Sequence, residues 1–232
     1  MKKIISIMLC AIMMAPSAMA FADSEAENTV SDLAASAVET MYYTGDSTVL
    51  RAALMDGYMN SLAQWTFIVN GGCWASQDEI ADPWGAVYSY LNSFGLNDSE
   101  KWPFDGDSSV AVSADYIRKT FENMFGKKYD VLPIVNRMYS SSIVYDEASN
   151  TYDIARADGE GTYAVLKEIR LTDDTSAAKG LVVMTYSIEN ENILESPVMG
   201  TVNIYLAASD VSASGLMPVS ADVIDLTADA EG

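Results

Sequence analysis

Aromatic and carboxylate side chains in the first half of the chain are the residues best suited to bind a ligand. Three tryptophans fall at expected helix edges or in loops: Trp74, Trp84 and Trp102. Carboxylates occur close to them, at Asp78, Glu79, Asp82 and Asp105. Indole rings stack on sugars and peptides, and carboxylates accept directed hydrogen bonds. This combination makes the three tryptophans the candidate ligand-binding residues. Packing of the same rings at the end of the core is the more common role of such residues.

Carboxylates also allow acid–base chemistry. The chain has 33 aspartate and glutamate residues. Two carboxyl groups roughly 5 to 10 Å apart can hydrolyse a glycosidic bond without any histidine. Because the sequence places no particular pair at that separation, a carboxylate-dependent glycan hydrolase is an alternative function rather than the leading one.

Histidine is absent from the whole chain. Ser-His-Asp and Cys-His catalysis, histidine-ligated zinc and the usual general base near neutral pH all need this residue. The two cysteines, Cys10 and Cys73, are too few for thiolate clusters. We therefore expect no cofactor and no metal site, and the balance favours a protein that is not an enzyme.

Three short motifs resemble known sites without their essential partners. The segment 71–76, Gly-Gly-Cys-Trp-Ala-Ser, resembles the nucleophile segment of papain-type proteases, but the histidine base of that family has no counterpart here. Ser-x-x-Lys at 176–179 resembles the motif of penicillin-binding enzymes, but its companion motifs are missing. Asp-Gly-Asp-Ser at 105–108 begins like a calcium loop and lacks the later ligands.

The N-terminus has the pattern of a secretion signal. Lys2 and Lys3 precede an apolar run over 4–15, and Ala18-Met19-Ala20 forms a small-x-small cleavage site. The run is shorter than the roughly 20 residues that span a bilayer. We therefore expect a signal peptide at 1–20, cleavage near Ala20, and an exported protein, secreted or periplasmic, with no membrane span in the mature chain.

Export would leave one cysteine and a strongly acidic chain. Cys73 is expected to be a buried small hydrophobic residue, with an intermolecular disulfide or a reactive thiol as the alternatives. The full chain has 13 basic and 33 acidic residues, a net charge of −20. Such a charge repels nucleic acid. The expected partner is an extracellular or cell-envelope molecule or a glycan, and no nucleic acid.

Hydrophobic periodicity divides the rest of the chain into two halves. Residues 21–140 are mainly helical, with helices expected over 26–42, 48–69, 83–94 and 114–125. Asp82 and Ser113 are the expected caps of the last two. The loop over 96–110 is the most linker-like stretch and could separate two subdomains.

Residues 141–232 alternate in the manner of strands, with turn signals between them. Strands joined by short loops form an antiparallel meander. The expected fold is α+β, with N-terminal helices packed on a C-terminal meander of four to five strands, and we expect the helices and the meander to form one domain. Residues 219–226 are the uncertain fifth strand, at an edge.

These patterns predict a soluble, exported, non-catalytic α+β protein. Its expected role is to bind a ligand or partner at the cell surface or outside the cell. Two alternatives stay open, namely the glycan hydrolase and a self-associating structural or secretion-accessory protein.

Overall fold

The computed structural model describes a core of the chain made from separate stretches. These are residues 38, 57–70, 73–80, 82–96, 102, 109–128, 142–156, 161–172, 181–193 and 198–225. The expected signal peptide lies outside the described residues, as does the predicted helix at 26–42 apart from residue 38. No helix of the described part is long and apolar enough to cross a membrane.

Three α-helices and seven strands make up this core. The α-helices are α4 (Tyr58–Trp65), α5 (Pro83–Tyr90) and α6 (Ala114–Phe125). Shorter helical turns are Thr66–Asn70, Gln77–Glu79 and Leu91–Gly95. The strands are β1 (Ser109–Ser113), β2 (Ile143–Asp146), β3 (Thr151–Ala155), β4 (Thr162–Leu171), β5 (Val182–Asn190), β6 (Val198–Ala208) and β7 (Leu216–Asp225).

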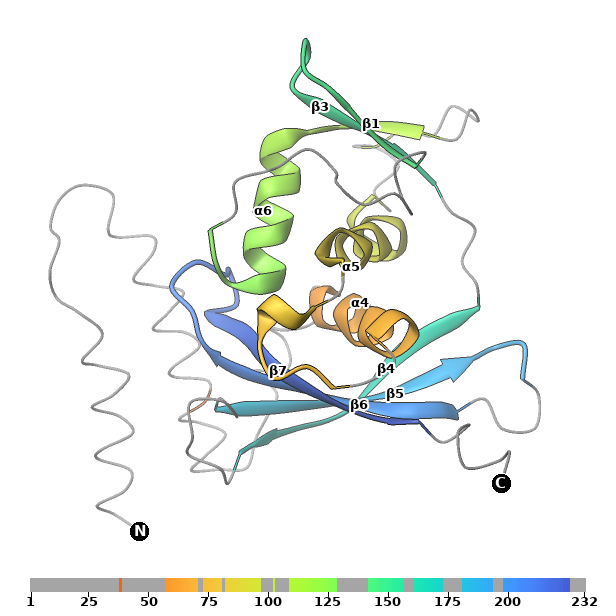
Figure 1. Cartoon of the computed structure of the whole chain (residues 1–232), viewed down its shortest axis with the longest axis vertical. Coiled ribbons are helices and arrows are strands. Elements are labelled where there is room, and N and C mark those ends of the chain that lie inside the picture. Colours follow the sequence, from red (N-terminus) through yellow and green to blue (C-terminus); the bar gives the residue numbers. More distant parts are fainter. Residues whose placement is uncertain are drawn as a thin grey trace, which may run out of the picture.

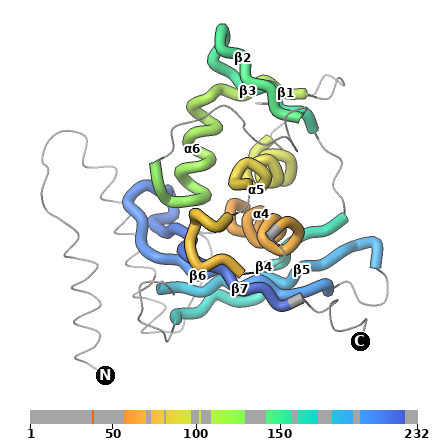
Figure 2. Tube along the Cα trace, viewed as in Figure 1, coloured from red at the N-terminus to blue at the C-terminus, as the bar shows by residue number. Residues whose placement is uncertain are grey.

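The strands form two antiparallel sheets on opposite sides of the helices. The larger sheet has the order β4-β5-β6-β7, and the smaller has the order β1-β3-β2. In Figure 1 the larger sheet forms the base, α4 lies on it, α5 lies between α4 and the smaller sheet, and α6 runs along the side from the smaller sheet toward β7. Figure 2 shows the same order along the Cα trace. The predicted α+β fold with a C-terminal meander is confirmed.

Two sequence predictions about strands had different outcomes. The uncertain edge strand at 219–226 exists, and β7 extends from Leu216 to Asp225. The linker-like interpretation of 96–110 is wrong at its end, because Ser109 and Val110 begin β1. β1 pairs with β3 and therefore belongs to a second sheet that the sequence analysis did not anticipate. Its five residues, Ser-Val-Ala-Val-Ser, give too short an alternation to separate from the loop before it.

One face of the larger sheet packs into the hydrophobic core. On β5 the side chains of Val182, Met184, Tyr186 and Ile188 alternate with those of the other face and are fully buried. They lie in one hydrophobic core together with Leu62 of α4 and with buried residues of α5, α6 and the smaller sheet. Period-two alternation, which predicted these strands, therefore also sets which residues enter the core.

Helix α4 is buried from several sides. Leu62 and Ala63 have no exposed surface, and Trp65 is 7% exposed. A Cβ atom at Gly85 of α5 would overlap the ring of Trp65. The absence of a side chain at Gly85 therefore lets α5 approach α4 closely enough to cover it.

Two amide side chains of α4 hold the outer edge of β4. Asn60 Nδ2 donates to the carbonyl oxygen of Ala164 at 3.1 Å, and Gln64 Nε2 donates to that of Thr162 at 2.8 Å. Four residues of helix rise about 6.0 Å, and two residues of strand about 6.6 Å. The two spacings match, so one helix face serves two successive carbonyls that β5 does not reach.

Helix α6 begins and ends where the sequence predicts. The Ser113 Oγ accepts a hydrogen bond from the N–H of Tyr116 at 3.2 Å, which caps the first turn. Gly126 ends the helix with a φ of 65°, a conformation that glycine adopts without steric cost. The carbonyl of Gly126 accepts a hydrogen bond from Ser209 Oγ at 2.7 Å, which joins the helix end to the loop between β6 and β7.

We expect the Asn60→Ala, Gln64→Ala double variant to unfold at lower urea concentration. Each lost hydrogen bond to an edge carbonyl is worth about 0.5–1.5 kcal/mol, so the pair should cost about 1–3 kcal/mol. Urea denaturation measures the change. Gln64→Glu serves as an isosteric control that removes the donor but keeps the packing. If Gln64→Glu is as stable as the wild type, the amide contacts do not contribute as described.

Candidate binding surface

The structure places the three predicted tryptophans in different environments. Trp74 is 1% exposed, and its indole N–H donates to Thr66 Oγ1 at 3.2 Å. Its backbone exchanges two hydrogen bonds with Ala221 of β7. Trp74 is therefore a core residue that offers no ring face to a ligand. Trp84 and Trp102 are half-buried and pack against the core.

Trp84 and Trp102 contact different sides of α6. The Trp84 ring meets Phe121 edge to face at a centroid distance of 4.8 Å, whereas the Trp102 ring lies 5.4 Å from Tyr116. Five residues of helix turn through about 500°, which leaves Phe121 and Tyr116 about 140° apart. The predicted tryptophans therefore do not share one groove.

The burial of Trp74 also explains the exposure of its neighbour. Cys73 is an exposed free thiol, so the expectation that it is buried is wrong. Successive side chains of an extended segment point to opposite sides. Because Trp74 points into the core where its backbone pairs with β7, Cys73 points outward.

Two of the predicted carboxylates are occupied by local contacts. Glu79 Oε2 accepts a hydrogen bond from the N–H of Ala75 at 2.9 Å, and Asp78 Oδ1 lies 3.6 Å from Nζ of Lys127. Asp105 lies outside the described residues. No group of three or more acidic or cysteine side chains suited to a metal ion occurs in the described part. The glycan hydrolase stays a prediction without an identified carboxylate pair.

Asp82 has an unusual position at the start of α5. Asp82 occupies the N-cap position before Pro83, as predicted, but its φ is 54° and its side chain makes no capping hydrogen bond. Its Oδ2 atom is buried without a hydrogen-bond partner. Burial raises the pKa of Asp82 above its ordinary value, and the N–H groups of Gly85 and Trp84 offset part of that rise.

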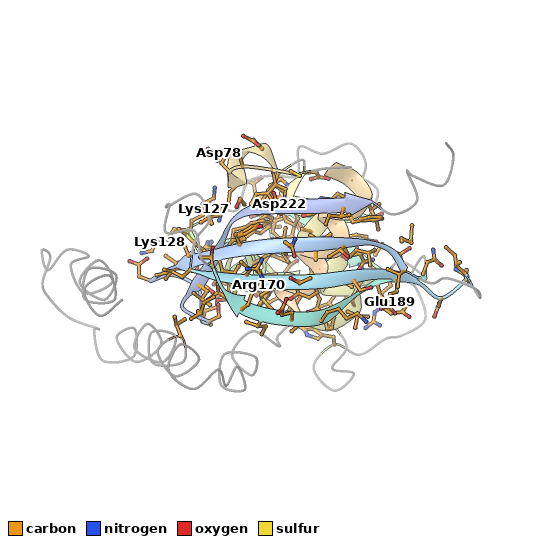
Figure 3. All side chains as sticks on the ribbon, turned by 90° about the horizontal axis from the view of Figure 1, so that it is seen from below. Asp78, Lys127, Lys128, Arg170, Glu189 and Asp222 are labelled. Atoms are coloured by element: carbon orange, nitrogen blue, oxygen red, sulfur yellow. The ribbon has the colours of Figure 1, made fainter. Side chains whose placement is uncertain are left out.

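Several polar side chains on the outer face of the larger sheet, which Figure 3 shows from below, bond to one another. Thr185 Oγ1 donates to Asn203 Oδ1 at 2.8 Å, and the Tyr205 hydroxyl donates to Asp222 Oδ2 at 2.7 Å. Lys167 Nζ lies 2.8 Å from Glu189 Oε1, and this contact lowers the pKa of Glu189. These cross-strand pairs stabilise the sheet and occupy its polar groups.

An aromatic chain leads from the core to the surface at the smaller sheet. Neighbouring ring centroids lie 4.8 to 5.9 Å apart along a series of five side chains, namely Phe125, Phe121, Trp84, Tyr152 and Tyr145. Phe125 is fully buried and Tyr145 is 39% exposed. Trp84 is thus the predicted residue that connects the core to an exposed ring.

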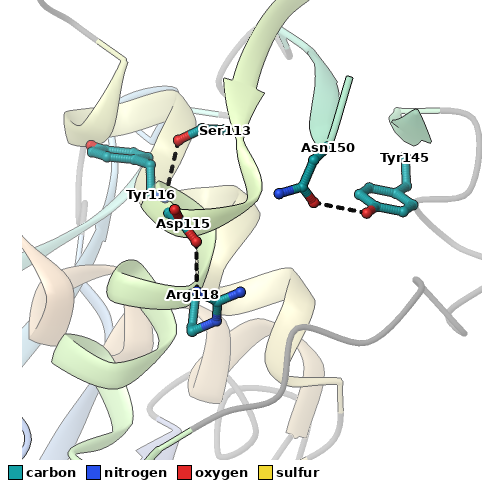
Figure 4. Close-up of polar contacts among 6 residues, drawn as sticks. All are labelled: Ser113, Asp115, Tyr116, Arg118, Tyr145 and Asn150. Carbon is teal, nitrogen blue, oxygen red and sulfur yellow. Dashed lines mark hydrogen bonds and ion pairs between the residues drawn. The ribbon is translucent and has the colours of Figure 1, made fainter. Parts of the chain in front are cut away.

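Tyr145 is held in place from two directions. Its ring packs on Tyr152 at 4.8 Å, and its hydroxyl donates to Asn150 Oδ1 at 2.8 Å (Figure 4). Asn150 has a φ of 54°, which asparagine tolerates better than most residues. Asp146 holds the same hairpin turn, because its carboxylate accepts from the N–H of Ala148 and the hydroxyl of Ser149.

An ion pair lies on the first turn of α6, close to this hairpin (Figure 4). Arg118 Nη1 lies 2.6 Å from Asp115 Oδ1; the Asp115 side chain is largely exposed, and the Arg118 side chain is partly exposed. Burial and the nearby Tyr145 raise the pKa of Tyr152, while Arg118 lowers it. Tyr152 is therefore a neutral packing residue near pH 7. We call Tyr145, Tyr152, Asn150, Asp115 and Arg118 the Tyr145 surface.

Sequence reasoning missed the Tyr145 surface. Ile143 and Tyr145 are two positions apart in the sequence, as are Tyr152 and Ile154, which is the spacing of residues on one face of a strand. In the structure all four face the same side of the smaller sheet. What the sequence lacked was the contact between Tyr152 and Trp84, which lie 68 positions apart. The sequence signal that is present, carboxylates close to tryptophans, points to the three tryptophans instead.

No protein-family model, no curated protein and no solved structure matches this chain.

We expect Asp82→Asn to stabilise the protein at neutral pH. A raised carboxyl pKa in the folded state means that stability falls as the pH rises from the ordinary value of 3.8 through the folded value, and the cost remains above it. Asparagine removes the charge and tolerates the positive φ. Urea denaturation between pH 3 and 7.5 should show a gain at pH 7 that shrinks toward zero in acid.

Asp153→Asn, at an exposed position of β3, is the matched control. A gain at pH 7 that persists unchanged at pH 3, or an equal gain in the control, would show that ionisation of the buried Asp82 carboxyl is not the cause.

Proposed function

We propose that this protein is an exported, non-catalytic binding protein. It holds a ligand or partner at the cell surface or outside the cell, through the Tyr145 surface. The observation that carries the proposal is the rigid exposed ring of Tyr145, fixed below by Tyr152 and at its hydroxyl by Asn150. The N-terminal signal pattern supports export.

A fixed aromatic ring suits binding because little conformational entropy is lost when a ligand covers it. Ordering a mobile side chain at an interface costs about 0.5–1.5 kcal/mol. Tyr145 avoids much of this cost, since the hairpin already holds its ring. The neighbouring Asp115 and Arg118 offer exposed hydrogen-bonding groups beside an apolar face, a combination found at glycan and peptide sites.

We expect Tyr145→Ala to abolish most ligand binding. Anchoring aromatic residues contribute about 2 kcal/mol or more, which corresponds to roughly thirtyfold in affinity. Binding of the purified protein to glycan and peptide arrays, followed by titration of the best binders, measures the effect. Tyr163→Ala is the matched control, because Tyr163 is 41% exposed but lies on β4 of the other sheet.

The proposal fails if no glycan or peptide binds the wild type. It fails equally if Tyr145→Ala and Tyr163→Ala reduce binding to the same extent, since the loss would then not depend on the Tyr145 surface.

A further inference from the structure

Along the outer edge of β2, the backbone hydrogen-bonding groups have no partner among the described residues. In an antiparallel pair, alternate residues bond to the partner strand and the residues between them point away. The N–H of Ala155 donates to the carbonyl of Ser142 at 2.7 Å, which fixes the phase of this alternation. Val144 and Asp146 therefore bond to β3, and Ile143 and Tyr145 direct their N–H and C=O groups outward. No described residue bonds to the backbone of Ile143 or Tyr145 on that side.

Unlike the outer edge of β2, both edges of the larger sheet are partly covered by other residues of the chain. At β4, the side chains of Asn60 and Gln64 occupy successive edge carbonyls. At β7, the backbone of Trp74 exchanges hydrogen bonds with Ala221 at 3.0 and 2.9 Å. An open edge is a liability that proteins usually cover. The chain closes part of each of these edges with its own residues, and β2 has no such cover among the described residues.

The side chains along β2 are those that an added strand would cover. Val144 is 54% exposed on one face of the smaller sheet, and Tyr145 is 39% exposed on the other. A strand that pairs with Ile143 and Tyr145 would shield apolar surface on both faces while its backbone satisfies the edge. The opposite edge, β1, presents only small side chains at its outward positions Ser109 and Ala111.

The charge around β2 selects the chemistry of the added strand. Asp146, Glu147 and Asp153 are exposed carboxylates of the β2–β3 hairpin. Hydrogen bonds from Ser149 and Ala148 lower the pKa of Asp146, so that its charge persists in mild acid. The nearby Arg118 is paired with Asp115. A second copy of a chain of net charge −20 would bring the same carboxylates together, which disfavours self-pairing.

We infer that the β2 edge accepts an extended, basic segment of a partner polypeptide as a fourth strand of the smaller sheet. This inference rests on the proposed function and adds the class of partner to it. Backbone hydrogen bonds to Ile143 and Tyr145 supply binding that tolerates many sequences. Basic side chains facing the hairpin carboxylates supply the selectivity.

Selection of random twelve-residue peptides displayed on phage tests the inference with the full mature protein. We expect the enriched peptides to be basic and to alternate apolar with polar residues. The best one is then synthesised with a single N-methyl group at each position in turn. Methylation removes one donor, so binding should weaken about tenfold at the two positions, two residues apart, that face Ile143 and Tyr145, and little at the position between them.

Variants of Val144 test the role of charge, because Val144 is exposed and can be replaced without opening the core. We expect Val144→Lys to weaken binding of the selected basic peptide several-fold at low salt, and Val144→Glu to leave it unchanged or stronger. Tyr163→Ala should change nothing.

The outcomes separate the inference from the proposed function. Peptides that depend on Tyr145 but show no two-residue period on methylation, or that are acidic, overturn the added strand and leave the proposed function standing. A dimer by light scattering that Val144→Lys abolishes would identify a second copy as the occupant and also overturn the inference. If no peptide or glycan depends on Tyr145, both fall.

Discussion

The contact between α4 and the larger sheet is the interaction on which the rest of the structure depends. Leu62 and Ala63 are completely buried between the sheet and the other helices. Asn60 and Gln64, on the same helix, hold the edge of β4. One short helix therefore buries the apolar face of the sheet and satisfies part of its edge. Because α5 and α6 pack on α4, the position of the smaller sheet follows from this contact.

The series of packed aromatic rings connects this core to the surface of the smaller sheet. Phe125 and Phe121 belong to α6, Trp84 begins α5, and Tyr152 and Tyr145 belong to the smaller sheet. Close packing of rings leaves few voids and transmits position from one residue to the next. The exposed ring of Tyr145 is therefore set by the core rather than by a loose loop, which is what a preformed binding surface requires.

The two sheets also differ in how their edges are closed. Both edges of the larger sheet are covered in part by residues that the chain supplies from a distance, Asn60 and Gln64 at β4 and Trp74 at β7. In the smaller sheet, no described residue bonds to the backbone of Ile143 and Tyr145 on the outer side of β2. Backbone N–H and C=O groups need hydrogen-bond partners. This requirement explains why other residues cover the β4 and β7 edges, and it identifies the outer edge of β2 as one without such cover among the described residues.

The sequence predicted those helices and strands whose ends and buried faces are set by neighbouring residues. Helix α6 has its cap at Ser113 and its glycine at Gly126, and the alternation of β4 to β7 follows directly from the sequence. The failures involve contacts between distant residues. Trp74 is buried because it pairs with Ala221, 147 positions later, and this pairing turns Cys73 outward. Asp82 occupies the N-cap position that its pattern predicts, but its backbone has a positive φ and its side chain makes no capping hydrogen bond.

The Tyr145 surface also depends on contacts between residues that are distant in the sequence. The residues of β2 and β3 predicted strands, yet neither their pairing with β1 nor the contact of Tyr152 with Trp84 has a local signature. A surface assembled from α5, α6 and two hairpin strands becomes visible only when the fold brings them together.

Residue-resolved amide hydrogen exchange of the free protein tests the central claim most directly. The account predicts that the amides of Val144 and Asp146, bonded to β3, exchange slowly, whereas the amide of Tyr145 between them exchanges much faster because it faces an open edge. Equal protection of Val144, Tyr145 and Asp146 would show that the β2 edge is already occupied and would contradict the account.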